Sequence, residues 1–298
     1  MRHNLYLHRR SLLVMGQGVA SRLYLAVGYN SGVRALAKFL ALLRIYIEDS
    51  LAYRASAFIW MLTDIIHCLV MPLVWLSAYN GKASIGGYNP GEMVTYYVLM
   101  AFVTNFIVSH LMWDLSWEIK EGVLSQWLLR PVPVGWMLFA RNLSWRAMRM
   151  VMFLPMAALA LWYYSRFTTL SPLYLGWEFW LSVLLGHLVS FWVAYALACL
   201  AFWLQEVQSV FSLYYVPMLL LSGWVAPIAL MPEWLQTLAS LMPFRYTTAV
   251  PTEIALGKLT GDLMWSQIGI QGLWVLIGMG LTAILWRAGL RQYTGVGM

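Results

Sequence analysis

The chain has 298 residues, of which 61% are hydrophobic and only 10% are charged, and its mean hydropathy is +0.69. Soluble domains carry about 25% charged residues, so this composition excludes a soluble enzyme, a disordered protein and a nucleic-acid-binding protein. The net charge of +7 and the 17 tryptophans and 17 tyrosines suit a bilayer, where amphipathic rings collect at the headgroup level. We therefore expect an all-α, polytopic membrane protein.

The first 32 residues are predicted to be a basic cytoplasmic extension. Arg9 and Arg10 precede an apolar run, but Gly16 and Gly18 break that run before it reaches the length of a signal peptide. Residues 33–54 then repeat apolar positions every three or four residues, which predicts an amphipathic helix lying in the inner membrane interface. A helix packed on a soluble partner is the alternative. The apolar stripe consists of Leu36, Leu40, Leu43, Ile47 and Leu51.

Residues 55–298 are predicted to form a transmembrane domain with six spans. A helix that crosses about 30 Å of hydrocarbon needs about 20 mostly apolar residues. The stretches that meet this requirement are 55–79, 93–113, 143–164, 179–204, 207–227 and 267–286.

The distribution of basic residues predicts the orientation. If both termini are cytoplasmic, all but four of the 19 lysines and arginines lie on the cytoplasmic side. The four exceptions are Lys82, Arg166, Arg245 and Lys258. Because cytoplasmic loops carry the excess of lysine and arginine, we expect a multi-pass inner-membrane protein with both ends inside.

The sequence lacks the motifs of a self-sufficient enzyme. It contains no GxxxxGK[ST] phosphate loop, no HExxH or GxSxG motif, and no paired His/Cys ligand spacing. The two cysteines, Cys68 and Cys199, form no metal or redox pattern. We therefore expect a chain that binds no cofactor or metal itself, and any energy for transport must come from an ion gradient or a separate ATPase.

Three ionisable residues are predicted at bilayer depth and are candidates for a translocation pathway. Asp64 is the only acid well inside a predicted span, and His67 follows it by one helical turn on the same face. Such residues are expensive in lipid, so Asp64 either lines a cavity or bonds to a neighbouring helix; the sequence favours neither. His187 fits an interhelical hydrogen bond better than a pathway role.

The stretch between the second and third predicted spans, 114–133, is amphipathic but too charged to cross a membrane. Its residues 117–129 are predicted to form one helix, which Pro131 and Pro133 then end. Gly122 either lets a partner backbone approach closely or is only a turn residue that weakens the helix. The charged residues that we expect to be available to a partner are Glu118, Glu121 and Arg130.

Residues 119–132, Ile-Lys-Glu-Gly-Val-Leu-Ser-Gln-Trp-Leu-Leu-Arg-Pro-Val, resemble the I-x-x-G-x-[LIF]-x-x-x-L-L-[RK]-P segment of ABC-2 type permeases that have no ATPase domain of their own. The region that contains Pro232, Trp234 and Pro243 resembles the outer helical hairpin of that family. The ending 289–297, Gly-Leu-Arg-Gln-Tyr-Thr-Gly-Val-Gly, resembles its GLRRYxxxG terminus, with Gln292 where a second basic residue is common. The resemblance covers residues 33–298.

This resemblance implies the membrane-spanning subunit of an ABC exporter. Such permeases pair as homodimers or heterodimers and bind two copies of a separate ATPase, which would hold ATP and Mg. The helix of residues 117–129 would be the coupling element, and the short segment 232–242 would be part of a re-entrant hairpin that closes the exit. A cavity lined by aromatic and aliphatic side chains would suit an amphipathic or hydrophobic solute.

Two other classes of protein remain as alternatives. An ion-coupled secondary transporter would need more buried acids than Asp64 alone. A membrane-embedded enzyme acting on lipid-linked substrates would need polar residues that converge at one interface, and the sequence contains no such cluster.

Overall fold

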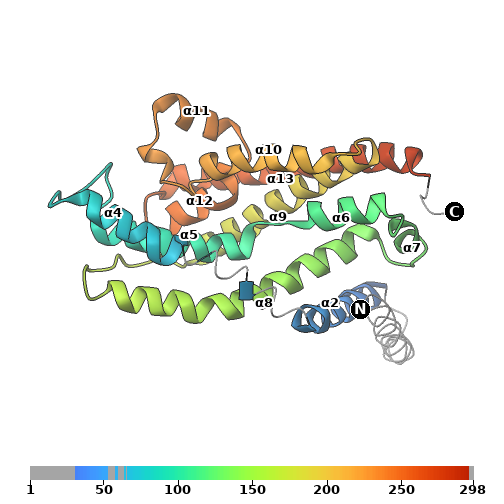
Figure 1. Ribbon diagram of the computed structural model, residues 1–298, viewed down its shortest axis with the longest axis horizontal. Helices are drawn as coiled ribbons and strands as arrows, with labels where there is room; N and C mark the ends of the chain where they lie inside the picture. The colour runs from blue at the N-terminus through green and yellow to red at the C-terminus, as the bar shows by residue number, and fades with distance from the viewer. Residues whose placement is uncertain (1–30, 53–57, 60–63, 65, 295–298) are drawn as a thin grey trace. The chain divides into compact units, whose positions relative to one another are not determined.

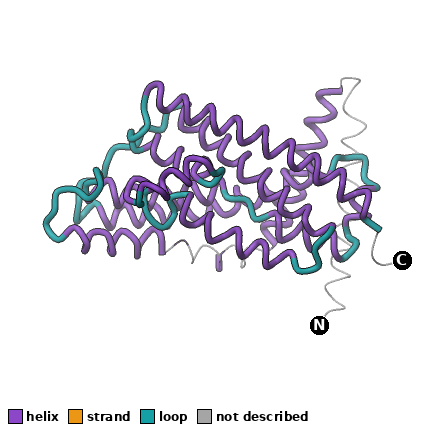
Figure 2. The backbone as a smooth tube through the Cα atoms, turned by 90° about the horizontal axis from the view of Figure 1, so that it is seen from above, coloured by secondary structure: helices purple, strands orange, loops and turns teal. Residues whose placement is uncertain are grey.

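The computed structural model describes residues 31–52, 58–59, 64 and 66–294. These residues form helices joined by turns and loops, and this part of the chain contains no strand (Figure 2). The all-α class predicted from the sequence is therefore confirmed. The chain divides into two compact units: the first comprises Met1–Arg54 and Pro131–Met148, and the second comprises Ala55–Arg130 and Arg149–Met298.

The first unit contains α2 (Ser31–Ala52) and the beginning of α8 (Val134–Tyr164). The Phe39 ring lies 6.2 Å from the rings of both Trp136 and Phe139, and the Ser144 hydroxyl is 3.3 Å from the Leu43 carbonyl oxygen. The helix α2 confirms that the segment predicted to be amphipathic is helical. Most of its apolar stripe is exposed, namely Leu36, Leu40, Ile47 and Leu51.

Among the described residues, four helical segments are long and apolar enough to cross a membrane: Pro90–Lys120, Val134–Tyr164, Trp177–Phe202 and Gly261–Gln292. They correspond to the second, third, fourth and sixth predicted spans. The first and fifth predicted spans coincide with shorter apolar helices, His67–Tyr79 and Val207–Leu221. Most of residues 55–65 lies outside the described residues, so the structure supports four spans where the sequence predicts six.

The segment Pro90–Lys120 is a broken helix. It consists of α5 (Pro90–Ile107), three non-helical residues and α6 (Leu111–Lys120). A break inside a bundle is tolerated only when the freed backbone groups find partners. Here the Ser109 amide donates to Ser190 Oγ at 2.8 Å, and His187 Nδ1 lies 3.0 Å from the Ile107 carbonyl oxygen. Both partners come from α9 (Trp177–Cys199).

Helix α9 is the centre of the second unit. It packs along α13 (Gly261–Gln292), and it also contacts α12 (Arg245–Ala255), α5 and α6 (Figure 1). Gly186 makes the approach to α12 possible, because a Cβ at this position would lie 2.4 Å from the Thr247 carbonyl oxygen. The large buried side chains between these helices include Met93, Tyr96, Tyr97, Met100, Ile107, Phe179, Tyr246 and Ile254.

The remaining helices of the second unit are short. The π-helical turn η1 (Ile66–Val70) leads into α4 (Met71–Tyr79), α7 is Leu124–Leu128, and the 3-10 turn η2 (Leu200–Phe202) extends α9. The chain then forms α10 (Val207–Leu221), η3 (Ile228–Leu230) and α11 (Glu233–Leu241). Helix α11 follows Pro232 and is too short to cross a bilayer. Within this unit α11 and α7 lie at opposite ends (Figure 1).

Candidate functional site

Asp64 lies in a buried polar cluster with Arg149 and Asn105. Arg149 Nη2 on α8 is 2.9 Å from Asp64 Oδ2, and Asn105 Nδ2 on α5 donates to the same oxygen at 2.9 Å. Only 10% of the Arg149 side chain and 7% of the Asp64 side chain are exposed. A buried charge is tolerated only when it is paired and hydrogen-bonded, and this carboxylate meets both conditions.

This geometry is that of a link between helices. The carboxylate accepts from a guanidinium and an amide at once, so it ties the segment around Asp64 to α5 and α8. The sequence places Asp64 at bilayer depth but treats Arg149 as one of several arginines at the membrane interface. No spacing along one helix reveals a partner on another helix, so the pair has no sequence signal.

The two histidines have separate partners. The His67 ring stacks on the Trp224 ring, with centroids 3.9 Å apart and planes inclined by 23°. Trp224 belongs to the turn that follows α10. His187 is 3% exposed and contacts the carbonyl of Ile107 at the break between α5 and α6. The three pathway candidates therefore engage three different parts of the second unit.

The predicted coupling segment is not one continuous helix. Helix α6 ends at Lys120, and the chain turns at Gly122, whose φ of 73° is left-handed, before α7 begins at Leu124. Glycine adopts this conformation without the steric cost that a side chain imposes. The structure thus corrects the prediction of a single helix over 117–129 and assigns Gly122 to a turn.

The charged residues of this segment are not equivalent. Glu121 and Arg130 are exposed, as predicted, whereas Glu118 is only 6% exposed. This burial corrects the expectation that Glu118 is available to a partner. Leu124 and Trp127, on α7, are also buried. The surface that α6 and α7 present is therefore built around Glu121 and Arg130.

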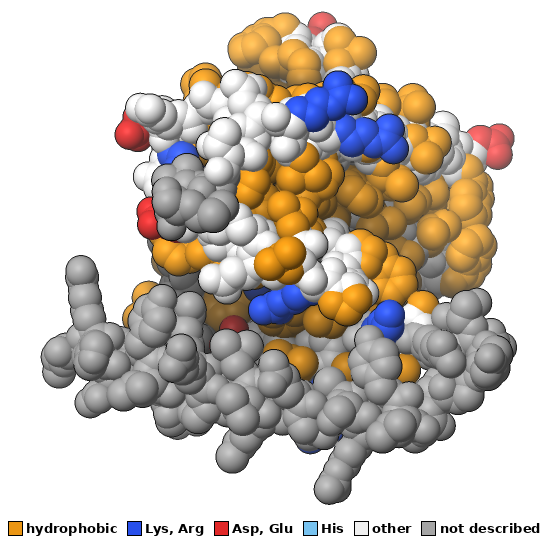
Figure 3. Space-filling model, turned by 90° about the vertical axis from the view of Figure 1, so that its right-hand side faces the viewer, with side chains coloured by type: hydrophobic (Ala, Val, Ile, Leu, Met, Phe, Trp, Pro, Cys, Tyr) orange, Lys and Arg blue, Asp and Glu red, His pale blue; other side chains and the backbone are white. Residues whose placement is uncertain are grey.

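Helix α10 and the loop before it hold α6 in place. Trp113 Nε1 donates to the Tyr215 hydroxyl at 3.1 Å, and Lys120 donates to the Gln205 carbonyl. Figure 3 looks onto this end of the molecule, where lysine and arginine side chains lie among hydrophobic ones. In the segment that follows α7 and in the last turns of α13, the exposed basic residues are Arg130, Arg287 and Arg291.

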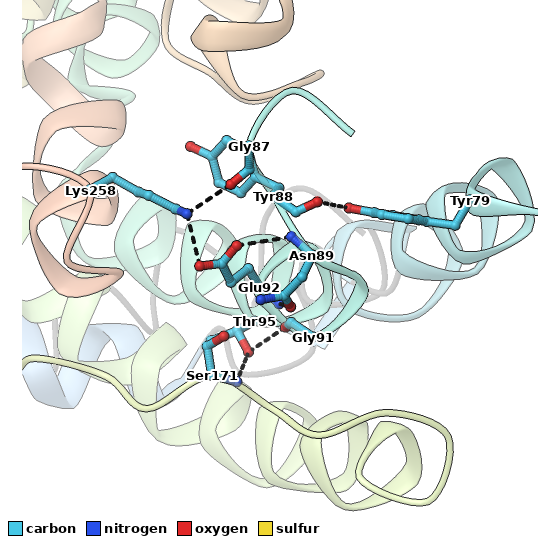
Figure 4. Close-up of polar contacts among 9 residues, drawn as sticks. All are labelled: Tyr79, Gly87, Tyr88, Asn89, Gly91, Glu92, Thr95, Ser171 and Lys258. Atoms are coloured by element: carbon cyan, nitrogen blue, oxygen red, sulfur yellow. Dashed lines mark hydrogen bonds and ion pairs between the residues drawn. The ribbon is translucent and has the colours of Figure 1, made fainter. Parts of the chain in front are cut away.

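A second polar network surrounds Lys258 at the start of α5 (Figure 4). Lys258 Nζ is 2.8 Å from Glu92 Oε1 and 2.9 Å from the Gly87 carbonyl oxygen, and it lies over the Tyr88 ring. Asn89 and Glu92 form a capping box, which satisfies free amides at the first turn of α5. Burial, with Glu253 and Glu92 adding to it, raises the pKa of Tyr88. The Tyr88 hydroxyl therefore stays protonated beside Lys258.

Two tyrosines on α5 bind the turn that follows α10. The Tyr96 hydroxyl donates to the Gly223 carbonyl at 2.6 Å, and the Tyr97 hydroxyl donates to the Val225 carbonyl at 2.8 Å. Gly223 has a φ of 82°, and a Cβ there would lie 2.6 Å from the Tyr96 hydroxyl oxygen. Sequence reasoning missed both tyrosines, because an apolar span rich in aromatic residues does not indicate which hydroxyls have partners.

The described residues form helices, several of them apolar and of membrane-spanning length, which is the architecture of a polytopic membrane protein. The chain belongs to the ABC-2 transporter family: the family model described as "ABC-2 family transporter protein" matches residues 59–297. This match confirms the resemblance seen in the sequence.

Two curated relatives are similar to the chain. Both are described as "Probable multidrug ABC transporter permease YbhR", one from Escherichia coli strain K12 and one from Escherichia coli O157:H7. Each is 27% identical over 189 residues, which are 61% of this chain and 49% of the relative. The chain thus spans about half the length of these relatives. No solved structure matches the chain.

Proposed function

We propose that the chain is the permease subunit of an ABC exporter, which moves an amphipathic or hydrophobic solute outward with energy from a separate ATPase. The observation that carries the proposal is the α6–α7 segment, because it presents Glu121 and Arg130 on a surface anchored to the membrane helices. Family membership supports the same role. In this proposal ATP and Mg bind to the ATPase and not to this chain.

The assembly would contain two copies of the ATPase and two permeases, either as a homodimer or as a heterodimer. The end that carries α7 would face the cytoplasm, with both termini on that side of the inner membrane. The exposed Arg130, Arg287 and Arg291 support this orientation, because basic residues gather on the cytoplasmic side. The Pro232–Pro243 region, with the exposed Trp234, would then lie at the outer interface.

The nature of the cargo rests on composition and on the relatives. The relatives are described as probable multidrug permeases, and the exposed and buried surfaces of this chain are largely aromatic and aliphatic. Cavities lined in this way take apolar bodies with a few polar groups. An ion-coupled transporter is less well supported, because the Asp64 carboxylate already has an arginine partner.

The test is a charge reversal at Glu121, on the surface of α6 and α7 that we expect to be the docking surface for the ATPase. Glu121→Lys should prevent co-purification of a cognate ABC ATPase, because loss of a desolvated interfacial charge pair costs about 2–5 kcal/mol. Glu233→Lys is the matched control, since Glu233 is also exposed but lies on α11, at the other end of the second unit. Equal ATPase recovery with both variants would place the docking surface elsewhere. Transport that stops with an uncoupler at constant ATP would favour the ion-coupled alternative.

A further inference from the structure

The C-terminal run that begins at Gly289 has no part in the proposed function so far, yet it contacts the coupling segment. The Tyr293 hydroxyl is 3.0 Å from Ser125 Oγ on α7. The Tyr293 ring also meets the Phe202 ring edge-on, with centroids 5.9 Å apart. All of these residues belong to the second unit.

Gly289 allows the end of α13 to come close to Phe202. A Cβ on Gly289 would lie 2.0 Å from Phe202 Cδ2, and the clash involves three atoms of a packed ring. The same ring contacts Trp286, one turn earlier on α13, at 5.7 Å. Phe202 is thus held along the last turns of α13, and the approach at Gly289 places Tyr293 within reach of α7.

Helix α7 depends on such contacts for its position. It has only five residues, and isolated helices shorter than about 12–15 residues are marginal in water. The left-handed turn at Gly122 separates it from α6, and the exposed Leu129 and Arg130 follow it. The buried Leu124 and Trp127 and the bond between Ser125 and Tyr293 therefore contribute to its orientation.

We infer that Tyr293 is a positioning residue for the coupling segment: through Ser125 it fixes α7 to the end of α13. Movement of α7 by the ATPase then reaches α13 directly, in addition to reaching α5 through α6. This inference rests on the proposed function. It also gives the Gly289–Tyr293 run a physical task, since Gly289 sets the close approach and Tyr293 makes the bond.

The test is a double-mutant cycle in the complex of permease and ATPase, reconstituted in phosphatidylethanolamine–phosphatidylglycerol vesicles. The measured quantity is the rate of ATP hydrolysis with the permease relative to the rate of the ATPase alone, so no cargo is needed. Tyr293→Phe and Ser125→Ala should each lower this ratio about fivefold, which corresponds to about 1 kcal/mol, the value of one ordinary hydrogen bond. The double variant should be no worse than either single variant.

Two variants control for general damage. Ser125→Thr keeps a hydroxyl and should keep most of the wild-type ratio. Tyr174→Phe removes a different tyrosine hydroxyl, whose partner is Glu178 in an exposed contact outside the α7 region, and should leave the ratio unchanged. Additive losses in the double variant, or an unchanged ratio with Tyr293→Phe, would overturn the positioning role.

A cross-linking arm separates failure of the contact from failure of the proposed function. Ser125→Cys/Tyr293→Cys should be joined by a short bifunctional thiol reagent in the permease without its ATPase, while the native cysteines are buried. Efficient cross-linking without any effect of the permease on ATP hydrolysis would overturn the proposed function, and with it the coupling role of Tyr293. Absence of cross-linking would overturn the contact itself, whatever the ATPase does.

Discussion

Arg149 and Asp64 are 85 positions apart in the sequence and form a buried ion pair, with 2.9 Å between Nη2 and Oδ2. Asn105 completes the pair from α5, so three segments share one carboxylate oxygen. In a lipid environment neither charge has water as an alternative partner. The pair therefore joins these segments more firmly than an ion pair at a surface would.

Loss of one member of this pair should destabilise the protein severely. Arg149→Leu leaves the buried Asp64 carboxylate without its guanidinium partner, and breaking a buried pair in this way costs about 3–5 kcal/mol. Asp64→Leu should damage assembly in the same way, whereas Asp64→Asn should fold but alter transport. The double variant Asp64→Leu/Arg149→Leu should recover much of the lost stability. Thermal aggregation in detergent measures each variant, and a double variant as unstable as the sum of both singles would contradict this account.

The pair between Lys258 and Glu92 should matter less. Its side chains are 29% and 19% exposed, and ion pairs within reach of water contribute about 0–1 kcal/mol. Lys258→Met should therefore lower the melting temperature less than Arg149→Leu does, and the difference from wild type should shrink in high salt. The same thermal assay in low and high salt is the measurement. A loss as large as that of Arg149→Leu would mean that the network around Lys258 is held much more tightly than its exposure indicates.

The left-handed turn at Gly122 should be required for coupling. Gly122→Ala forces a side chain into a positive φ, which costs about 1–2 kcal/mol, and should favour a straight helix in place of the turn. Gly122→Asn should be milder, because asparagine tolerates this conformation. Gly257→Ala is the control: it has a φ of 68° and open space around it, but lies outside the coupling segment. Permease-dependent ATP hydrolysis should fall for Gly122→Ala and stay normal for Gly257→Ala; equal effects would refute the prediction.

The orientation can be tested with two exposed positions. A membrane-impermeant thiol reagent added outside the cell should label Lys82→Cys and should miss Arg130→Cys. Both side chains are exposed in the structure, so a difference in labelling reports the side of the membrane and not accessibility within the protein. Permeabilised cells provide the positive control for Arg130→Cys. Labelling of Arg130→Cys alone in intact cells would reverse the topology.

The sequence predicts the helical class and the approximate position of most helices, because apolar length is a local property. The third predicted span, 143–164, lies within α8, but the helix begins earlier, at Val134. The reason is that Arg146 and Arg149 read as interfacial residues, although the structure buries both. The partner of Arg149, Asp64, lies 85 positions away in the chain, and no local pattern encodes such a partner.

The break between α5 and α6 is a second feature that local patterns do not encode. Residues 108–110 are Val-Ser-His, without the glycine or proline that usually interrupts a helix. The break is stable because Ser190 and His187 on α9 bind the freed groups. The turn at Gly122, by contrast, had a signal in the glycine itself, and the sequence left open whether that glycine serves a turn or a close contact.

Interrupting the helix at residues 108–110 also has an electrical consequence. Each helix carries a partial negative charge at its C-terminal end and a partial positive charge at its N-terminal end, so α5 and α6 turn opposite ends toward each other. A carbonyl can only accept, so His187 donates from Nδ1 to Ile107, while Ser190 Oγ accepts from the Ser109 amide. Helix α9 therefore supplies a donor, His187, at the C-terminal end of α5 and an acceptor, Ser190, at the amide just before α6. One helix thus neutralises both partial charges that the interruption exposes.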